Sequence, residues 1–258
     1  MRSGISALDY AVNPYTGCSH ACRYCYATFM ARYSGHAEEW GRFVDAKISM
    51  PETLSREVRR KPRGRVGLST VCDPYQPAEA QRQLTRRVLR ILSNAGFPVL
   101  VMTKSDLVTR DIDILRGAKD VQVEMTIVTM EDDVARFFEP GAPLPRARLE
   151  ACRELLAAGI PVEVFVGPVL PYFTDRPEPM ARLFEQLKSA GIGHAGVDKF
   201  NYLPSKYRSF KTELAQRWPE AVPAFERLLG SPETYAEELR EQTRALAKAA
   251  GIECEVLF

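Results

Sequence analysis

Short apolar runs rich in β-branched residues alternate along this chain with longer amphipathic stretches that end at Gly. The runs are Arg65–Val71, Val99–Thr103, Val121–Val128, Val162–Val169 and Gly196–Tyr202. Short apolar runs of this kind are typical of parallel strands that are buried on both faces. A repeated order of helix, Ala-Gly and strand predicts β/α units, and this restricts the chain to an α/β fold.

Helical spacing of apolar residues fills the intervals between these runs. The expected helices are Gln81–Ala95, Asp111–Lys119, Arg146–Ala158, Pro179–Ala190, Phe210–Leu229 and Glu233–Ala250. One more strand before Asn13 gives about six β/α units, and a last strand is expected at Glu253–Phe258. We therefore expect a single domain over residues 1–258, a partial (β/α)6 TIM-like barrel from about residue 5 to about residue 205 with a C-terminal extension over about 206–258.

Composition is that of an ordinary globular protein. The 258 residues are 45% apolar and 26% charged, with a net charge of +2 that neither demands nor excludes a polyanionic partner. The chain has no apolar run long enough to span a membrane and no apolar region typical of a secretory signal. The expected compartment is the cytoplasm.

Three of the six cysteines crowd into one short segment with the spacing C-x3-C-x2-C. They are Cys18, Cys22 and Cys25, within Asn-Pro-Tyr-Thr-Gly-Cys-Ser-His-Ala-Cys-Arg-Tyr-Cys-Tyr-Ala. Such clustering indicates metal binding rather than a disulfide framework. Three thiolates on one loop can bind three irons of a 4Fe–4S cluster and leave the fourth iron open, whereas a ferredoxin-type carrier normally closes that position.

Two other interpretations of the cysteines stay open at this point. A structural zinc site could combine the three cysteines with His20 or His36, although such sites usually have two separated ligand pairs. The cysteines could also be free and bind no metal. Cys152 and Cys254 are isolated in a helix and a strand and read as core residues.

The segment with its aromatic residue before the last cysteine resembles the signature of the radical S-adenosylmethionine (SAM) superfamily, and more specifically its spore photoproduct lyase-like subgroup. The resemblance extends to Asp73-Pro74-Tyr75-Gln76-Pro77, Thr103-Lys104-Ser105 and Phe138-Glu139-Pro140-Gly141. It implies that SAM binds the open iron, that an electron from the cluster cleaves it, and that the resulting 5′-deoxyadenosyl radical abstracts hydrogen from a substrate.

The resemblance also implies roles for residues at the ends of the expected strands. Tyr24 is expected against the adenine of SAM, and Lys104 beside its carboxylate. Ser69 and Thr70 are expected near the SAM amino group, where hydroxyl and carbonyl oxygens suit an ammonium. Gly167 is expected to present backbone to the adenine.

Glu124 and Thr126 lie two residues apart in one expected strand and therefore share a face. By resemblance they reach the ribose or methionine part of SAM. A glutamate inside an apolar run is costly to bury without a partner, so Glu124 is either functional or part of an ion pair.

Cys72, Asp73 and Tyr75 follow the second expected strand. By resemblance to spore photoproduct lyase, the Cys72 thiol is a candidate hydrogen-atom donor, and Tyr75 a candidate partner in a radical relay. A buried apolar role for Cys72 and simple packing for Tyr75 are the alternatives. Asp73 either accepts a hydrogen bond from SAM or substrate or forms a turn before Pro74.

Two basic stretches could attract phosphates: Arg56–Arg65, and Arg82 with Arg86, Arg87 and Arg90 on the helix expected at Gln81–Ala95. The alternative is that these arginines lie on the solvated outer face of a barrel helix, and nucleic-acid binding is not favoured.

The prediction is a radical SAM enzyme of unknown substrate, reduced by a partner such as flavodoxin or ferredoxin. The alternatives are a DNA-lesion lyase like spore photoproduct lyase, a non-enzymatic iron–sulfur carrier or sensor, and a zinc-stabilised binding module.

Overall fold

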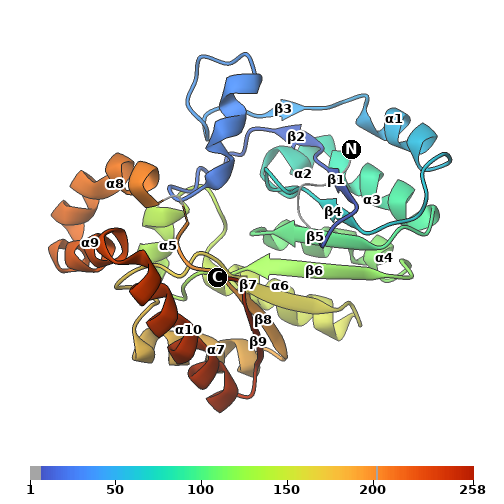
Figure 1. The fold of residues 1–258 in the computed structure, drawn as a ribbon. Coiled ribbons are helices and arrows are strands. Elements are labelled where there is room, and N and C mark those ends of the chain that lie inside the picture. Colours follow the sequence, from blue (N-terminus) through green and yellow to red (C-terminus); the bar gives the residue numbers. More distant parts are fainter. Residues whose placement is uncertain (1–6, 202) are drawn as a thin grey trace.

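A seven-stranded parallel sheet forms the centre of the molecule, for which we use a computed structural model that describes residues 7–201 and 203–258. The strand order is β1-β4-β5-β6-β7-β8-β9. The strands are β1 (Tyr10–Val12), β4 (Val66–Leu68), β5 (Val99–Thr103), β6 (Val121–Thr126), β7 (Val162–Val166), β8 (His194–Val197) and β9 (Glu253–Val256). Each strand of this sheet pairs in parallel with its neighbour in that order, so β1 and β9 form the two edges of an open half-barrel (Figure 1).

Alternation along the strands separates the core from a polar interior. Val101, Val123 and Val164 point outward and are fully buried beneath the helices. The neighbouring positions Met102 and Glu124, which are in register, face the other side of the sheet and are only partly buried. Successive strand residues point to opposite faces, so the same strands build both the apolar core and the wall of a cavity.

Helices cover the outside of the sheet and the ends of its strands (Figure 1). They are α1 (Met50–Glu57), α2 (Ala78–Arg82), α3 (Leu84–Asn94), α4 (Ile112–Leu115), α5 (Asp132–Phe138), α6 (Pro145–Ala157), α7 (Pro177–Ser189), α8 (Leu203–Arg217), α9 (Val222–Gly230) and α10 (Pro232–Ala249). Three short 3-10 helices are η1 (Tyr26–Tyr33), η2 (Asp106–Asp111) and η3 (Pro219–Ala221), and β2 (Tyr15–Thr16) pairs antiparallel with β3 (Asp45–Ala46). No described helix is both long and apolar enough to cross a membrane.

The single helix expected at Gln81–Ala95 is wrong. The chain forms α2 and α3, separated by Gln83 in the left-handed region with φ 50°. The Glu79 carboxylate accepts hydrogen bonds from the backbone N–H groups of Thr85 and Arg86. These bonds satisfy the free donors at the start of α3 and make a new helix start possible.

This break also divides the basic stripe expected on that helix. Arg82 ends α2, whereas Arg86 lies in α3 and pairs with Asp111 and Asp113 at 2.7 and 2.6 Å. Arg87 pairs with Glu52 at 2.7 Å. Arg86 and Arg87 are therefore occupied by carboxylates of the chain itself.

The C-terminal part differs from expectation in two ways. The expected helix Phe210–Leu229 is interrupted at Trp218 and Pro219, because proline lacks the N–H that would continue the helix, and α8 and α9 form instead. The last strand, β9, is confirmed, but it joins the main sheet beside β8 instead of lying in an extension outside the barrel. The strands expected at Arg65–Val71 and Gly196–Tyr202 are shorter, and Tyr202 lies outside the described residues.

Aromatic side chains attach α8 and α9 to the rest of the molecule. Phe138 of α5 contacts Phe210 of α8 and Phe225 of α9, with ring centroids 5.5 and 6.3 Å apart, and all three are fully buried. Such rings bury large apolar areas and add favourable edge contacts. These two helices therefore pack against the end of α5, beside the loop that carries the clustered cysteines (Figure 1).

Candidate functional site

A cavity of about 520 Å³ opens at the carboxyl ends of the parallel strands. The cysteine loop between β2 and η1 forms one wall, and β4 to β8 form the others. With the exception of Tyr75, all predicted site residues line it: Cys18, Cys22, Tyr24, Cys25, Ser69, Thr70, Cys72, Asp73, Lys104, Glu124, Thr126 and Gly167. The fold thus brings residues from positions 18 to 167 together at the face where parallel barrels place their working sites.

The three clustered cysteines all carry free thiols and border the cavity. Cys18 is buried, and Cys22 and Cys25 are half-buried. Burial raises the pKa of the Cys18 thiol to about 12, and Asp73 adds to the effect. Without a bound cation the Cys18 thiol is therefore protonated at neutral pH.

The arrangement of donors fits a multi-iron cluster better than a single metal ion. Among the described residues, no three Cys, His, Asp or Glu side chains converge closely enough to hold one ion. A tetrahedral zinc site requires such convergence, because each sulfur lies about 2.3 Å from the metal. In a 4Fe–4S cluster each cysteine binds a different iron, so thiols spaced around a cavity suit it.

Lys104 enters the cavity from the end of β5. Burial lowers the pKa of this ammonium, but Cys22 and Glu139 outweigh that effect and raise it above its ordinary value. The ammonium also lies 5.7 Å from the centre of the Tyr24 ring. A half-buried lysine that stays charged next to the cysteines is a suitable partner for an anionic ligand group.

Tyr24 belongs to a buried polar cluster beneath the cysteine loop. Its hydroxyl donates a hydrogen bond to Glu139, whose other oxygen pairs with Arg148 at 2.6 Å. Burial raises the pKa of Glu139, but Arg148 and Lys104 outweigh it and hold that pKa below its usual range. Glu139 and Arg148 are both fully buried, which fixes the Tyr24 ring in place.

The Asp73 carboxylate is occupied by hydrogen bonds from other parts of the chain. Its carboxylate accepts hydrogen bonds from the Thr103 hydroxyl at 2.8 Å and from the backbone N–H groups of Lys104 and Tyr75 at 2.7 and 2.9 Å. The His20 ring nitrogen Nδ1 lies 3.4 Å from it, and burial lowers the pKa of His20. Asp73 therefore joins the ends of β4 and β5, as the alternative turn role anticipated.

Cys72 presents a protonated thiol to the cavity. The thiol hydrogen bonds to the carbonyl of Tyr15 at 3.4 Å and to the Ser69 hydroxyl at 3.7 Å. Burial raises the pKa of Cys72 to about 11. Ser69 itself has φ 66°, so the backbone turns sharply at the end of β4, and Thr70 lies on the same turn.

Glu124 faces Glu163 across neighbouring strands. The two residues are in register on β6 and β7, and Glu163 lies 3.2 Å from the Nδ1 atom of His194 on β8. Burial, and next the negative charge of Glu163, raise the pKa of Glu124 to about 7. Near neutral pH the Glu124 side chain at the cavity wall is therefore about half protonated.

Thr126 and Gly167 complete the wall above this pair. A Cβ atom at Gly167 would lie 2.1 Å from the Phe165 ring. Glycine is required there because that ring, which also lines the cavity, packs directly on the backbone.

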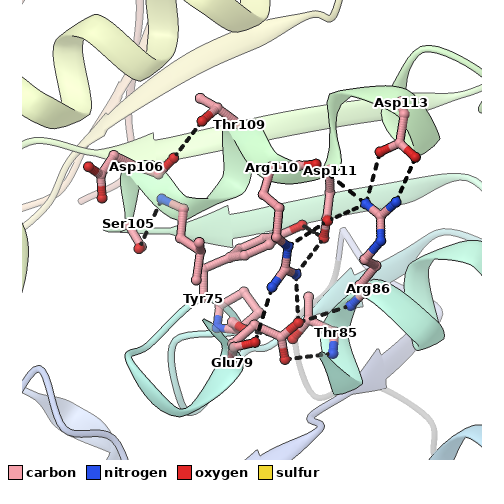
Figure 2. A network of polar contacts seen from close by, with 12 residues as sticks. Tyr75, Glu79, Thr85, Arg86, Ser105, Asp106, Thr109, Arg110, Asp111 and Asp113 are labelled. Atoms are coloured by element: carbon pink, nitrogen blue, oxygen red, sulfur yellow. Dashed lines mark hydrogen bonds and ion pairs between the residues drawn. The ribbon is translucent and has the colours of Figure 1, made fainter. Parts of the chain in front are cut away.

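Tyr75 lies outside the cavity, in a polar network shown in Figure 2. Its hydroxyl donates to Asp111 at 3.1 Å, and Asp111 pairs with Arg86 and Arg110 at 2.7 and 2.8 Å. Arg110 also pairs with the buried Glu79 at 2.7 Å. The position of the hydroxyl gives no support to the radical-relay role predicted for Tyr75.

Several cavity residues received no role from the sequence. Phe165, Asp198, Lys199 and Asn201 also line the cavity. Asp198 and Lys199 come directly after β8, so their position behind a parallel strand was an available signal. The sequence holds no such signal for Arg148, because an arginine in an amphipathic helix usually faces solvent.

Solved structures share this fold at low sequence identity. Spore photoproduct lyase complexed with dinucleoside spore photoproduct matches the whole chain and 78% of its own length, with a TM-score of 0.70 and 17% identity. Streptococcus suis SuiB bound to S-adenosylmethionine matches 81% of this chain and 48% of its own, with a TM-score of 0.55 and 12% identity. The half-barrel is thus the partial α/β barrel found in spore photoproduct lyase.

Sequence comparisons reach the same family. An uncharacterized protein of Mycobacterium tuberculosis is 34% identical over 248 residues, which is 92% of this chain and 73% of the relative. An uncharacterized protein of Methanocaldococcus jannaschii is 30% identical over 218 residues, 84% of this chain and 79% of the relative. Residues 12–185 match the model of the radical SAM superfamily. This chain belongs to the radical SAM superfamily.

Proposed function

We propose that the protein holds an open 4Fe–4S cluster on Cys18, Cys22 and Cys25 and cleaves SAM reductively in the adjoining cavity. The observation that carries the proposal is the convergence of these three thiols and the half-buried, charged Lys104 on one cavity. When bound, such a cluster supplies the electron that splits SAM into methionine and a 5′-deoxyadenosyl radical, which then takes a hydrogen atom from a substrate.

The chain's own residues would bind and orient SAM. The Lys104 ammonium is placed to pair with the SAM carboxylate. Tyr24 offers a fixed aromatic face to the adenine, since Glu139 and Arg148 hold the ring. The Ser69 and Thr70 turn and the Glu124 and Thr126 positions offer oxygen acceptors for the SAM amino and ribose groups.

Anaerobic reconstitution with iron and sulfide tests this proposal. The protein should gain close to four irons per chain and a brown charge-transfer absorption, and after reduction by dithionite it should form 5′-deoxyadenosine from SAM. Replacing any of Cys18, Cys22 or Cys25 by Ala should abolish both, whereas Cys152→Ala, outside the cavity, should change neither. A cluster that leaves SAM intact would support the carrier or sensor alternative and overturn the enzyme proposal.

A second candidate is a lyase acting on a nucleic-acid lesion. It is favoured by the similarity of the whole chain to spore photoproduct lyase and by the protonated Cys72 thiol in the cavity. There the S–H hydrogen atom would pass to a carbon radical of the product, and the thiyl radical left on sulfur would take a hydrogen atom back from 5′-deoxyadenosine, so that SAM could re-form and the thiol be restored. This candidate predicts that SAM is regenerated, so that far less than one 5′-deoxyadenosine accumulates per turnover. Cys72→Ala should retain its iron, but its SAM cleavage should no longer be coupled to product formation.

The electron donor is also a proposal. A flavodoxin or ferredoxin would replace dithionite in the cell, because cleavage requires one low-potential electron per event. Substituting a reduced flavodoxin in the same assay tests it, and 5′-deoxyadenosine formation is the expected result.

A further inference from the structure

The cysteine loop is held on both sides of Cys18 by one side chain from another part of the chain. The Gln76 amide donates a hydrogen bond to the carbonyl of Gly17 at 3.2 Å, and its oxygen accepts one from the backbone N–H of Ser19 at 3.0 Å. Gln76 is fully buried. The side chain therefore bridges the residue before Cys18 and the residue after it.

A backbone turn brackets Cys22 in the same way. The N–H of Arg23 donates to the carbonyl of Phe138 at 2.8 Å, and the N–H of Gly141 donates to the carbonyl of His20 at 3.0 Å. A Cβ atom at Gly141 would lie 2.0 Å from the Ser19 carbonyl oxygen. The approach of the two segments is thus so close that only glycine fits at position 141.

Gln76 and the Phe138–Gly141 turn, the two clamps on the cysteine loop, are themselves held in place by buried side chains. Gln76 lies in the loop that the polar network of Figure 2 fixes through Tyr75 and Asp111. The turn at Phe138–Gly141 is anchored by the buried Phe138 ring and by the pair of Glu139 with Arg148. Neither anchor includes a cysteine.

We infer that Gln76 and the Phe138–Gly141 turn are positioning elements that hold Cys18 and Cys22 in ligating geometry before any cluster binds. The inference deepens the proposed function, because it makes the cluster site a preformed part of the fold. It concerns the backbone of the metal-free chain, so it can fail or succeed whether or not SAM is cleaved. Preformed ligands spare the protein the entropy of ordering the loop when the cluster binds.

Amide hydrogen exchange of the metal-free, reduced protein tests the inference residue by residue. In the native chain, the Ser19 and Arg23 amides should exchange on the order of a hundredfold slower than in an unstructured peptide, as expected for amides inside a cooperative unit. Exchange of both at unstructured rates, beside a protected sheet, would overturn the proposal, because the cluster would then have to order the loop.

Two substitutions separate the clamps. Gln76→Met keeps the length and removes both polar groups, so it should speed exchange at Ser19 by roughly three- to tenfold, the loss of about one hydrogen bond, and leave Arg23 unchanged. Gly141→Ala should speed exchange at Arg23 and at residue 141. Gly193→Ala is the matched control, because a Cβ atom there meets nothing within 4 Å. Protection of the Val123 amide, which bonds to Pro161 in the sheet, shows whether each variant is folded.

A spectroscopic readout distinguishes positioning from a general loss of stability. After reconstitution, Gln76→Met and Gly141→Ala should lose iron to a chelator several-fold faster than the native protein and should broaden the electron paramagnetic resonance signal of the reduced cluster. Gly193→Ala should do neither. If Gln76→Met and Gly141→Ala match the native protein in both measurements, the clamps do not position the ligands.

Discussion

Arg148 lies 2.6 Å from Glu139, and both side chains are fully buried beneath the cysteine loop. Replacing Arg148 by Met leaves the Glu139 charge without this partner, and breaking a buried pair in this way typically costs about 3–5 kcal/mol. We expect Arg148→Met to lower the free energy of unfolding by about that amount in urea titrations of the metal-free protein. The double variant Glu139→Met with Arg148→Met should recover much of the loss. A loss below about 1 kcal/mol for the single variant would mean that water reaches the carboxylate.

The free energy of unfolding should fall as pH rises from about 4.5 to about 7, because of Glu124. Its pKa is raised to about 7 in the fold by burial and by Glu163, while Lys104 and Arg65 oppose the shift. An acid with a raised pKa binds more protons when folded, so the stability it contributes below the unfolded pKa is lost between about pH 4.5 and pH 7, by roughly 2–3 kcal/mol. Urea unfolding of the metal-free protein at several pH values should show this decline.

The decline should be reduced in Glu124→Gln, which cannot ionise. It should also be reduced in Glu163→Gln, which removes the like charge. Glu241→Gln, exposed on α10, serves as the control and should leave the pH dependence unchanged. An unaltered slope in Glu124→Gln would assign the effect to another group.

Lys104→Met should weaken SAM binding without removing the cluster. The loss of a charge-assisted contact with a carboxylate is worth about 1.5–3 kcal/mol, or roughly a 10- to 100-fold higher Kd. Calorimetry on the reconstituted protein measures this, with iron content as the check on the cluster. Lys119→Met, on the exposed surface, is the matched control. Equal affinity in both variants would remove Lys104 from the SAM site.

Tyr75→Phe should affect stability and leave chemistry intact. The variant loses the hydrogen bond from the Tyr75 hydroxyl to Asp111, whereas Asp111 keeps its ion pairs with Arg86 and Arg110. We expect a loss of about 1–3 kcal/mol in the free energy of unfolding. The rate of 5′-deoxyadenosine formation should stay within about twofold of the native rate, since Tyr75 does not line the cavity. A rate reduced tenfold or more would restore a catalytic role to Tyr75.

The sequence predicted the β/α order well because parallel strands buried on both faces leave a continuous apolar run, as in Val99–Thr103. It missed the division of α2 from α3, because that break depends on the Glu79 carboxylate reaching Thr85 and Arg86. Propensity alone favours one uninterrupted helix there. Placement of β9 in the main sheet depends on pairing with β8, which no local pattern records.

At the site, too, the sequence predicted what local patterns determine and missed what depends on distant partners. Residues that follow strands, such as Lys104 and Cys72, were found because parallel strands end at a common face. Arg148 and Gln76 were not given roles, since their partners are distant in the sequence and a polar residue gives no local sign of burial. Tyr75 shows the reverse situation, because it lies beside the site in sequence while its hydroxyl points into the network around Asp111.

The unclosed seam of the half-barrel leaves β9 with a free edge, where backbone donors and acceptors could recruit a strand from another molecule. Glu253 and Glu255 stand exposed on this short strand. Identical strands that approached one another there would bring like charges into contact, which is a common protection against edge-to-edge aggregation. The two glutamates therefore disfavour edge-to-edge pairing of copies of the chain at the open side of the barrel.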